Sequence, residues 1–144
     1  MPVVTQGNGE DVVARYKRAR ETRDVDAMME LYRDDADLRT DPFEEHATGV
    51  LAIRAHWNRV AAGQASVEFD AERVWVSRSA VLVAWHGAWT RRETAERLRE
   101  RGFMTLELDD DRMIVRERHW TIGHVVGTDS TLHPGTPTGP GTAD

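Results

Sequence analysis

Residues 12–57 read VVARYKRARETRDVDAMMELYRDDADLRTDPFEEHATGVLAIRAHW, and their pattern predicts the helices of the domain. Apolar residues recur at helical spacing over 11–23, with polar residues opposite them, which predicts a first helix. Asp24 or Asp26 can cap a short second helix, because aspartate is a favoured N-cap residue. A third helix is predicted over 50–62, where leucine, isoleucine, alanine and tryptophan form one apolar side. Helices therefore occupy the first part of the chain.

Strands dominate the second part of the chain. After Gly63 the apolar period shortens from about 3.6 residues towards 2, which indicates β-structure. Strands are predicted over 36–39, 67–76 with a bulge, 81–90, 103–108 and 113–122. A polar turn, Asp-Asp-Asp-Arg at 109–112, joins the last two as a hairpin. Helices grouped before antiparallel strands predict the α+β class, with N-terminal helices packed on one face of a curved antiparallel sheet.

The composition is typical of one globular domain. A chain of 144 residues with 40% hydrophobic content can build one core, and we expect a flexible N-terminus over 1–9, a domain over 10–126 and a disordered tail over 127–144. Cysteine is absent, which excludes disulfides and thiolate ligands. The net charge of −6 argues against nucleic acid as a partner. The longest apolar run, 80–85, is too short to span a membrane, and the start lacks a secretory pattern, so we expect a cytoplasmic location.

Several features of residues 12–57 occur in a fixed order. They are a tyrosine in the first helix, an aspartate-rich break, a Leu-Tyr pair followed by Asp-Asp-Ala, then Asp-Pro and Gly-x-x-x-Ile-Arg: Tyr16, Asp24, Leu31-Tyr32, Asp34-Asp35-Ala36, Asp41-Pro42 and Gly49 to Arg54. In this order and spacing the chain resembles the ketosteroid isomerases and the SnoaL-like polyketide cyclases of the nuclear-transport-factor-two-like superfamily. The resemblance implies a cone-shaped (cystatin-like) fold with a deep apolar pocket. It says less about the reaction, since this fold hosts many activities.

The resemblance also implies site residues. Asp41 occupies the place of the family's general base, Tyr16 matches a tyrosine that donates to the substrate oxyanion, and Tyr32 matches a supporting tyrosine. One extra residue precedes Asp41, so Arg39 or Thr40 could face the pocket instead. Met104 stands where the isomerases keep a protonated aspartic acid, and methionine cannot donate that hydrogen bond. A steroid isomerase is therefore disfavoured.

Further pocket residues follow from counting along the elements. The resulting set is polar at one end and aromatic at the other: His56, Trp57, Trp85, Trp89, Met104, Glu117, His119 and Trp120. Glu117 could orient His119 or raise its pKa, and the pair could then supply acid or base. A slip of one residue in the last strand would instead turn Arg116, Arg118 and Trp120 inwards.

Each of these residues also has a plain structural interpretation. Asp41 can be an ordinary turn residue before proline, Tyr16 a core tyrosine and His119 a half-buried strand histidine. The tryptophans can simply fill the core. The histidines lack the spacing of a zinc site, so no metal and no other cofactor is expected, and His86 should point out of the pocket.

Together these features predict a small-molecule isomerase or cyclase that uses cofactor-free general acid–base catalysis in an apolar pocket. Asp41 would be the base, and Tyr16 or His119 would donate to the oxyanion. The expected substrate is small and hydrophobic or polycyclic, and the expected partner is a second copy bound through the sheet. The alternatives are an epoxide hydrolase or dehydratase on the same fold, and a non-catalytic module that binds a small ligand.

Overall fold

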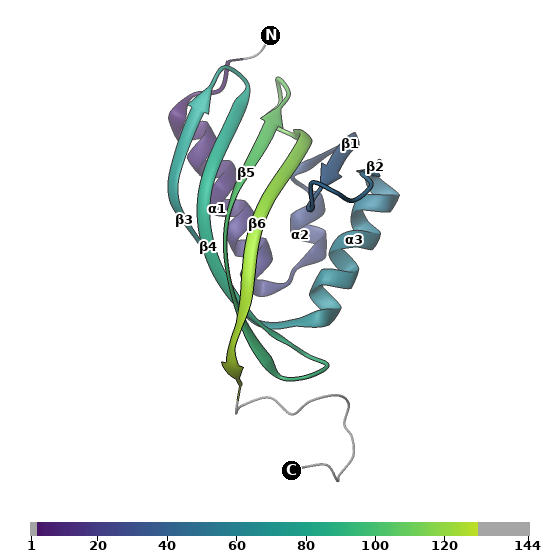
Figure 1. Cartoon of the computed structure of the whole chain (residues 1–144). Coiled ribbons are helices and arrows are strands. Elements are labelled where there is room, and N and C mark those ends of the chain that lie inside the picture. The colour runs from purple at the N-terminus through teal and green to yellow at the C-terminus, as the bar shows by residue number, and fades with distance from the viewer. Residues whose placement is uncertain (1–2, 130–144) are drawn as a thin grey trace.

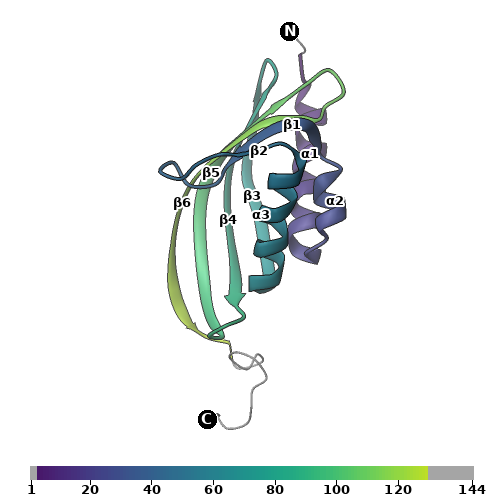
Figure 2. The same cartoon turned by 90° about the vertical axis from the view of Figure 1, so that its right-hand side faces the viewer.

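A computed structural model of the chain describes residues 3–129. Three helices and six strands follow one another as α1 (Gln6–Thr22), α2 (Val25–Met29), β1 (Tyr32–Arg39), β2 (Ala47–Thr48), α3 (Val50–Gly63), β3 (Gln64–Ser77), β4 (Ala80–Arg91), β5 (Glu96–Leu108) and β6 (Ile114–Thr128). All three helices lie on one face of a single curved sheet, as Figure 2 shows from the side. This is the α+β cone fold that the sequence predicts.

The first helix begins earlier than predicted. Thr5 caps α1 by accepting a hydrogen bond from the Asn8 backbone at 3.0 Å, and Val4 donates from its backbone to the Arg78 carbonyl. Gly9 packs so closely against Val76 that an added Cβ would lie 2.6 Å from a methyl carbon of that valine. These contacts correct the expectation of a flexible segment over 1–9: its residues from Val4 onward are part of the packed structure.

The second and third helices agree with the sequence in position. Asp24 caps α2 through a bond from the Ala27 backbone, as one of the two predicted caps. The helix then ends at Met29, and Tyr32 begins β1 instead of continuing the helix. The third helix, α3, follows Gly49, whose φ of 88° is a conformation that glycine adopts without strain.

The sheet is mixed, although an antiparallel one is predicted. The strand order is β2-β1-β6-β5-β4-β3, and all neighbours are antiparallel except β1 and β6. This parallel pair places Leu38 beside Glu117 and closes the cone around the helices. The predicted bulge in β3 is confirmed by a register shift between Ala71 and Arg73.

The β5–β6 hairpin carries the inner wall of the cone. Its turn lies where the sequence predicts it, at 109–112, and Arg112 adopts a φ of 63° there. Both strands are longer than predicted: β5 begins at Glu96, within a charged stretch, and β6 continues to Thr128. Residues 127 and 128 of the expected disordered tail thus belong to β6, and residues 130–144 lie outside the described part of the chain.

The core fills the space between the helices and the concave face of the sheet. Its most deeply buried side chains come from every layer: Val12, Tyr16, Leu31, Leu38, Ile53, Phe69, Val81, Val83, Met104, Leu106 and Ile114. Within residues 3–129, no helix is long and apolar enough to cross a membrane.

Candidate active site

A buried carboxylate lies at the centre of the cone. Glu117 on β6 is fully buried, and its side chain points to the helices because alternate residues of a strand face opposite sides. Its carboxylate accepts hydrogen bonds from the Tyr16 hydroxyl at 2.8 Å and from the Tyr32 hydroxyl at 2.5 Å. His119, two residues further on the same strand face, lies 2.5 Å away through its Nε2. We call Tyr16, Tyr32, Glu117 and His119 the Glu117 cluster.

Aromatic side chains hold this cluster in place. Trp57 on α3 donates from Nε1 to the Tyr32 hydroxyl at 3.0 Å and lies edge-on to the Tyr16 ring. Trp85 on β4 lies edge-on to the His119 ring, with centroids 6.5 Å apart. Met104 is the strand neighbour of His119 in β5 and is fully buried. The cluster is therefore polar within an apolar shell.

Burial and hydrogen bonding act in opposite directions on Glu117. Burial alone would raise the pKa of its carboxyl group, but the hydrogen bond and charge of His119 and the two tyrosine hydroxyls outweigh burial and lower that pKa. Burial, reinforced by the Glu117 charge, raises the pKa of both Tyr16 and Tyr32 well above the usual value. The carboxylate is thus ionised while both phenols stay protonated as donors.

A second histidine lies close to the cluster. His56 on α3 packs edge-on against Trp57 at 4.9 Å, and the charges of Glu117 and His119 both act on it. Burial lowers the pKa of His56 to about 4, although Glu117 opposes this shift. His56 is therefore a neutral imidazole at neutral pH, able to donate through one nitrogen and accept through the other.

One charged residue of the site was missed by sequence reasoning. Arg20 lies one helical turn beyond Tyr16 on α1, and its guanidinium lies 5.4 Å from the Trp57 ring centre and 5.8 Å from that of Phe69. Its position one turn after Tyr16 was the available signal, since residues four apart share a helix face. Sequence reasoning treats Arg20 as an ordinary surface charge, because arginine side chains are usually exposed.

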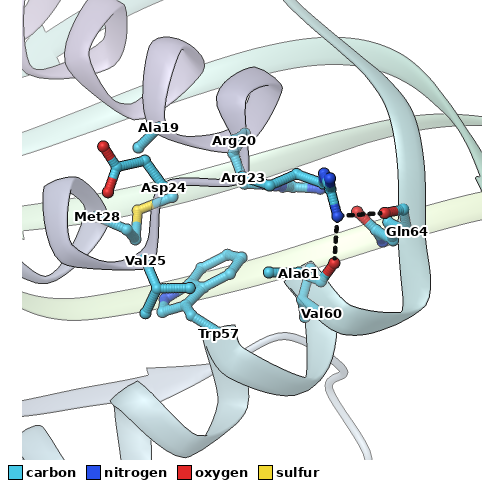
Figure 3. Close-up of a pocket in the computed structure, with 10 residues that line it drawn as sticks. All are labelled: Ala19, Arg20, Arg23, Asp24, Val25, Met28, Trp57, Val60, Ala61 and Gln64. Carbon is cyan, nitrogen blue, oxygen red and sulfur yellow. Dashed lines mark hydrogen bonds between the residues drawn. The ribbon is translucent and has the colours of Figure 1, made fainter.

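Three spaces lie beside Trp57 and His56, the two α3 residues next to the cluster. The first, drawn in Figure 3, is a narrow pocket between the ends of α1 and α3, where Trp57 and Val60 face Arg20 and Met28. Its volume of about 20 Å³ suits little more than a water molecule. The second is an open cleft of about 830 Å³ between the C-terminal half of α3 and the end of β4, lined among others by His56, Arg59 and Trp89. The third, a cleft of about 340 Å³ beside α3, is lined among others by Thr40 and His56. The second and the third are large enough to admit an organic substrate.

The structure places the predicted site residues in different regions. It brings Tyr16, Tyr32, Glu117 and His119 together, and it places His56, Trp57, Trp85 and Met104 around them. Trp89 lines the open cleft. His86, as predicted, points out of the cone and bonds Glu72 at 2.8 Å.

Asp41 and Trp120 lie apart from the cluster. Asp41 is half-buried in the turn after β1, where its carboxylate accepts a hydrogen bond from the Phe43 backbone at 2.9 Å, a turn role that aspartate commonly has before proline. Thr40, its neighbour, lines a cleft beside α3. Trp120 is 44% exposed on the face opposite His119, which corrects its assignment to the pocket. Alternate residues of a strand face opposite sides of the sheet. Because Glu117 and His119 face the inside of the cone, Trp120 must face outwards.

Three buried donors have no partner within residues 3–129. They are the Nε of Arg39 at the end of β1 and the indole N–H groups of Trp85 and Trp89, both on the inward face of β4. In the same part of the chain, no three His, Asp or Glu side chains gather so as to hold a metal ion.

Known structures share this fold. An epoxide hydrolase/cyclase-like enzyme, SalBIII, with a role in pyran ring formation in the polyether salinomycin, superposes with a TM-score of 0.76 at 19% identity, over 83% of this chain and 97% of that one. An LEH-like epoxide hydrolase of Mycobacterium tuberculosis gives a TM-score of 0.69 at 17% identity, over 81% of this chain and 84% of that one. A protein of Catenulispora acidiphila with a ketosteroid isomerase-like fold, in complex with trimethylamine, gives a TM-score of 0.68 at 14% identity, over 76% of this chain and 83% of that one.

The sequence itself assigns the family. No curated protein is similar enough to the chain to count as a match. The model of the SnoaL-like domain matches residues 13–117, which run from Val13 in α1 through all the elements between to Glu117 in β6. Because this match covers most of the chain and agrees with the observed cone, the chain belongs to the SnoaL-like domain family, within the nuclear-transport-factor-two-like superfamily.

Proposed function

We propose that the chain is a small-molecule isomerase or cyclase, which moves a proton next to a carbonyl group by general acid–base catalysis without a cofactor. His119 is the proton-transfer group, and Glu117 positions it. The observation that carries this proposal is the buried pair itself: a carboxylate with 0% exposure joined to an imidazole with 4% exposure in an apolar cone. In such surroundings a charge interaction is stronger than in water.

The geometry gives each nitrogen of His119 a separate task. Nε2 is held by Glu117, whereas Nδ1 makes no hydrogen bond within residues 3–129. With its proton on Nε2, His119 can accept a substrate proton at Nδ1, and the Glu117 carboxylate then stabilises the imidazolium. The electrons of the broken C–H bond pass to the carbonyl oxygen as an enolate. Return of the proton at another carbon isomerises the substrate, while attack of the enolate on a second carbonyl closes a ring.

Asp41 remains a rival for the role of base. Its position in the family motif supports it, but it reaches the site only if the turn after β1 changes, since its Oδ1 now bonds the Phe43 backbone. Tyr16 cannot donate freely to an oxyanion while it donates to Glu117. A substrate oxygen would have to share or replace that bond.

An epoxide hydrolase or dehydratase is the second candidate. The structures that support it are the two epoxide hydrolase-like proteins with the same fold. In that reaction the Glu117–His119 pair would activate water and a tyrosine hydroxyl would protonate the leaving oxygen. The third candidate function is that of a module that binds a small ligand without converting it.

Deuterium exchange distinguishes these functions without knowledge of the natural substrate. Planar ketones and epoxides would be incubated with the protein in D₂O and followed by NMR. We expect deuterium next to the carbonyl with the wild type and with Asp41→Asn, and a loss of about 10²-fold or more with His119→Gln. Near-UV circular dichroism checks that each variant is folded. Diol formation from the epoxides alone would favour the hydrolase, and exchange that His119→Gln leaves intact would contradict the proposal.

We further propose that the outer face of the sheet binds a second copy of the chain and that the protein is cytoplasmic. Three large apolar side chains support the interface: Trp75 is 37% exposed, Trp120 44% and Ile122 80%. Such side chains are enriched at the centres of interfaces. Light scattering should show a dimer that Ile122→Glu dissociates; a monomeric wild type at micromolar concentration would contradict this part of the proposal.

A further inference from the structure

A groove runs along one side of α3. The two larger clefts beside this helix share three lining residues, Glu44, His56 and Arg59, so they are neighbouring parts of one groove. The part of about 340 Å³ lies between α3 and the loop after β1, and the part of about 830 Å³ reaches the end of β4. Volumes of this size are typical of sites for small organic ligands. We call this space the α3 groove.

The helix presents mostly small side chains to the groove. Its lining residues recur three or four positions apart, a spacing that places them on one face of the helix. Four of them leave room because they have little or no side chain: Ala52, Ala55, Ala62 and Gly63. His56 and Arg59 are the two polar side chains that α3 contributes. Because both line both parts, they lie at the centre of the groove.

Neither of these two side chains has a hydrogen-bonding partner. Arg59 makes no hydrogen bond and no ion pair within residues 3–129, whereas Arg54, earlier on the same helix, bonds Asp26 at 2.8 Å. His56 makes no hydrogen bond in this part of the chain either, and its ring meets Trp57 edge-on at 4.9 Å. A guanidinium fork and an imidazole N–H are thus both available to a ligand in the groove.

The charge state of His56 makes it a donor without a charge of its own. Burial is the main cause that lowers the pKa of His56 to about 4, and the positive charge of Arg59 acts in the same direction. At neutral pH a neutral imidazole therefore lies beside a charged guanidinium. An anionic oxygen can accept from both, and its charge strengthens each hydrogen bond.

The acidic side chains of the groove leave this place open. Glu44 and Glu93 line the larger part, and Glu45 lines the smaller one. None of these three carboxylates forms an ion pair with Arg59, so its charge is not neutralised by them. A ligand carboxylate that binds there gains a partner and displaces none.

The wide end of the groove adds an aromatic ring and two more cations. Trp89 lines it together with Arg91 and Arg92. The Arg91 guanidinium lies 5.9 Å from the centre of the Trp89 ring, while the Arg92 Nε bonds the Gln64 carbonyl at 3.1 Å. An aromatic ligand can pack against Trp89 while its anionic group lies further along α3, because Trp89 and Arg59 line the same cleft.

We propose that the α3 groove binds a planar aromatic carboxylate, whose carboxylate group lies between Arg59 and His56 and whose ring lies towards Trp89. A carboxylate suits this place because its two oxygens match the planar fork of a guanidinium and keep a lone pair for an imidazole N–H. The inference goes beyond the proposed function, since it assigns a ligand to the groove and requires no contact with His119.

The test uses one matched pair of probes, 2-naphthoate and its neutral amide, 2-naphthamide. The two share the same ring and differ only in the charged group. Binding at neutral pH and low salt is followed by calorimetry and by quenching of tryptophan fluorescence. We expect the wild type to bind the acid at least about tenfold more tightly than the amide, the discrimination typical of one charge-assisted contact.

Variants of the two central residues locate the preference. Arg59→Gln should weaken binding of the acid about tenfold and leave the amide within about twofold, and Arg59→Lys should restore part of the loss. His56→Leu should weaken the acid about fivefold, whereas His56→Gln, which keeps an N–H donor, should recover most of that loss. Near-UV circular dichroism checks that each variant is folded.

A control on the same helix separates a site from general charge attraction. Arg54→Gln removes the same charge from a position that lines neither part of the groove, and it should leave the affinity for the acid within about twofold. Equal binding of acid and amide, no saturable binding of the acid, or the same loss in Arg54→Gln as in Arg59→Gln would overturn the inference.

NMR of the histidine rings shows where the acid binds. The Hε1 resonance of His56 should shift as the acid saturates the protein. Arg99, Arg101 and His124 line a separate cleft on the outer face of the sheet, which is the alternative place for an anion. A shift of the His124 resonance in place of that of His56 would put the acid there and overturn the inference.

The outcome is distinguishable from that of the proposed function. Naphthoate has no enolisable carbon, so its binding does not depend on proton transfer. His119→Gln should abolish deuterium exchange in ketones and leave the affinity for naphthoate within about twofold. Exchange without binding of naphthoate would refute the groove inference alone, and binding of naphthoate without exchange in any ketone would refute the proposed function alone.

Discussion

The molecule contains two carboxylate–histidine pairs that differ chiefly in their surroundings. Glu117 and His119 lie 2.5 Å apart inside the cone, with side chains 0% and 5% exposed. Asp37 and His46 lie 2.8 Å apart at the β1–β2 edge, with side chains 23% and 39% exposed. Each carboxylate accepts from several donors, and Asp37 also bonds Arg118 and Thr48.

Both pairs join a carboxylate to a histidine, so burial is what distinguishes the candidate active-site pair, Glu117–His119, from the structural pair, Asp37–His46. Burial would raise the pKa of Asp37, but Arg118, Thr48 and His46 lower it, just as hydrogen bonds lower that of Glu117. Asp37 thereby ties β2 and the loop before it to β1 and β6. Water screens this outer pair, and an exposed ion pair contributes little. The Glu117–His119 pair is shielded from water, so the loss of one member of the Glu117 cluster should strongly affect the stability of the folded protein.

Removal of the inner carboxylate should have the largest effect. We expect Glu117→Ala to lower the free energy of unfolding by about 3–5 kcal/mol, because it leaves three buried groups without their acceptor. Asp37→Ala, the matched change in the outer pair, should cost about 1 kcal/mol. Urea unfolding followed by fluorescence measures both. Similar losses for the two variants would show that burial does not distinguish the pairs.

The two tyrosine donors of Glu117 should differ in a defined way. Tyr16→Phe removes the 2.8 Å bond to Glu117 and a long 3.4 Å contact with His119 Nε2, and should cost about 1 kcal/mol, whereas Tyr32→Phe should cost about 2 kcal/mol. The difference arises because the Tyr32 hydroxyl also accepts the Trp57 Nε1–H, which would be left buried without a partner. Thermal and urea unfolding of both variants gives the order, and an equal or reversed order would contradict this reading of the cluster.

The pH dependence of stability tests the neutral state of His56. The pKa of His56 falls from 6.5 to about 4 on folding, so the unfolded chain binds the additional proton between these values. Stability should therefore decrease as pH falls from about 6.5 to 4, by on the order of 1–2 kcal/mol for this partly exposed group. A second loss should follow below about 4.5, where the Glu117 carboxyl takes up a proton in the unfolded chain before it does so in the folded one, in which its pKa is lowered. His56→Gln should remove the first loss only, while His124→Gln, on an exposed residue, should keep it.

The smallest effect is expected at the outer histidine. His46→Gln should change the free energy of unfolding by less than about 1 kcal/mol, and salt should reduce the difference further. His119→Gln provides the contrast, because a buried partner of Glu117 is removed there. Unfolding of both variants at low and high salt would show whether the outer pair is as weak as its exposure implies. If His46→Gln lowered the free energy of unfolding by more than about 2 kcal/mol, the Asp37–His46 pair would contribute as much as a buried interaction, and the comparison would fail.

Most of the fold was predictable because each element carries its own local signal. The spacing of apolar residues predicts α1 and α3, and Asp24 predicts the start of α2. The change of period after Gly63 predicts the strands. Errors occurred where a tertiary contact overrides composition. The polar segment before Asp11 is helical because Gly9 fits against Val76, and Glu96 begins a strand because its charged neighbours pair across the sheet.

The candidate site was predictable in part. Alternation along β6 placed Glu117 and His119 on the same inward face, and this prediction is confirmed. The resemblance put Tyr16 and Tyr32 in the pocket, but not their common acceptor, which lies 101 and 85 residues away in sequence. Asp41 stays a prediction, since the turn that carries it lies apart from the cluster.

The element types, the family and the side of the strand on which Glu117 and His119 lie follow from local periodicity and short motifs, which a single sequence contains. The sharing of one carboxylate by two tyrosines, the position of Arg20 over two aromatic faces and the surface position of the Asp37–His46 pair follow from the packing of distant segments. These facts depend on which distant residues meet and on how much water they lose, and no pattern within a single element contains that information.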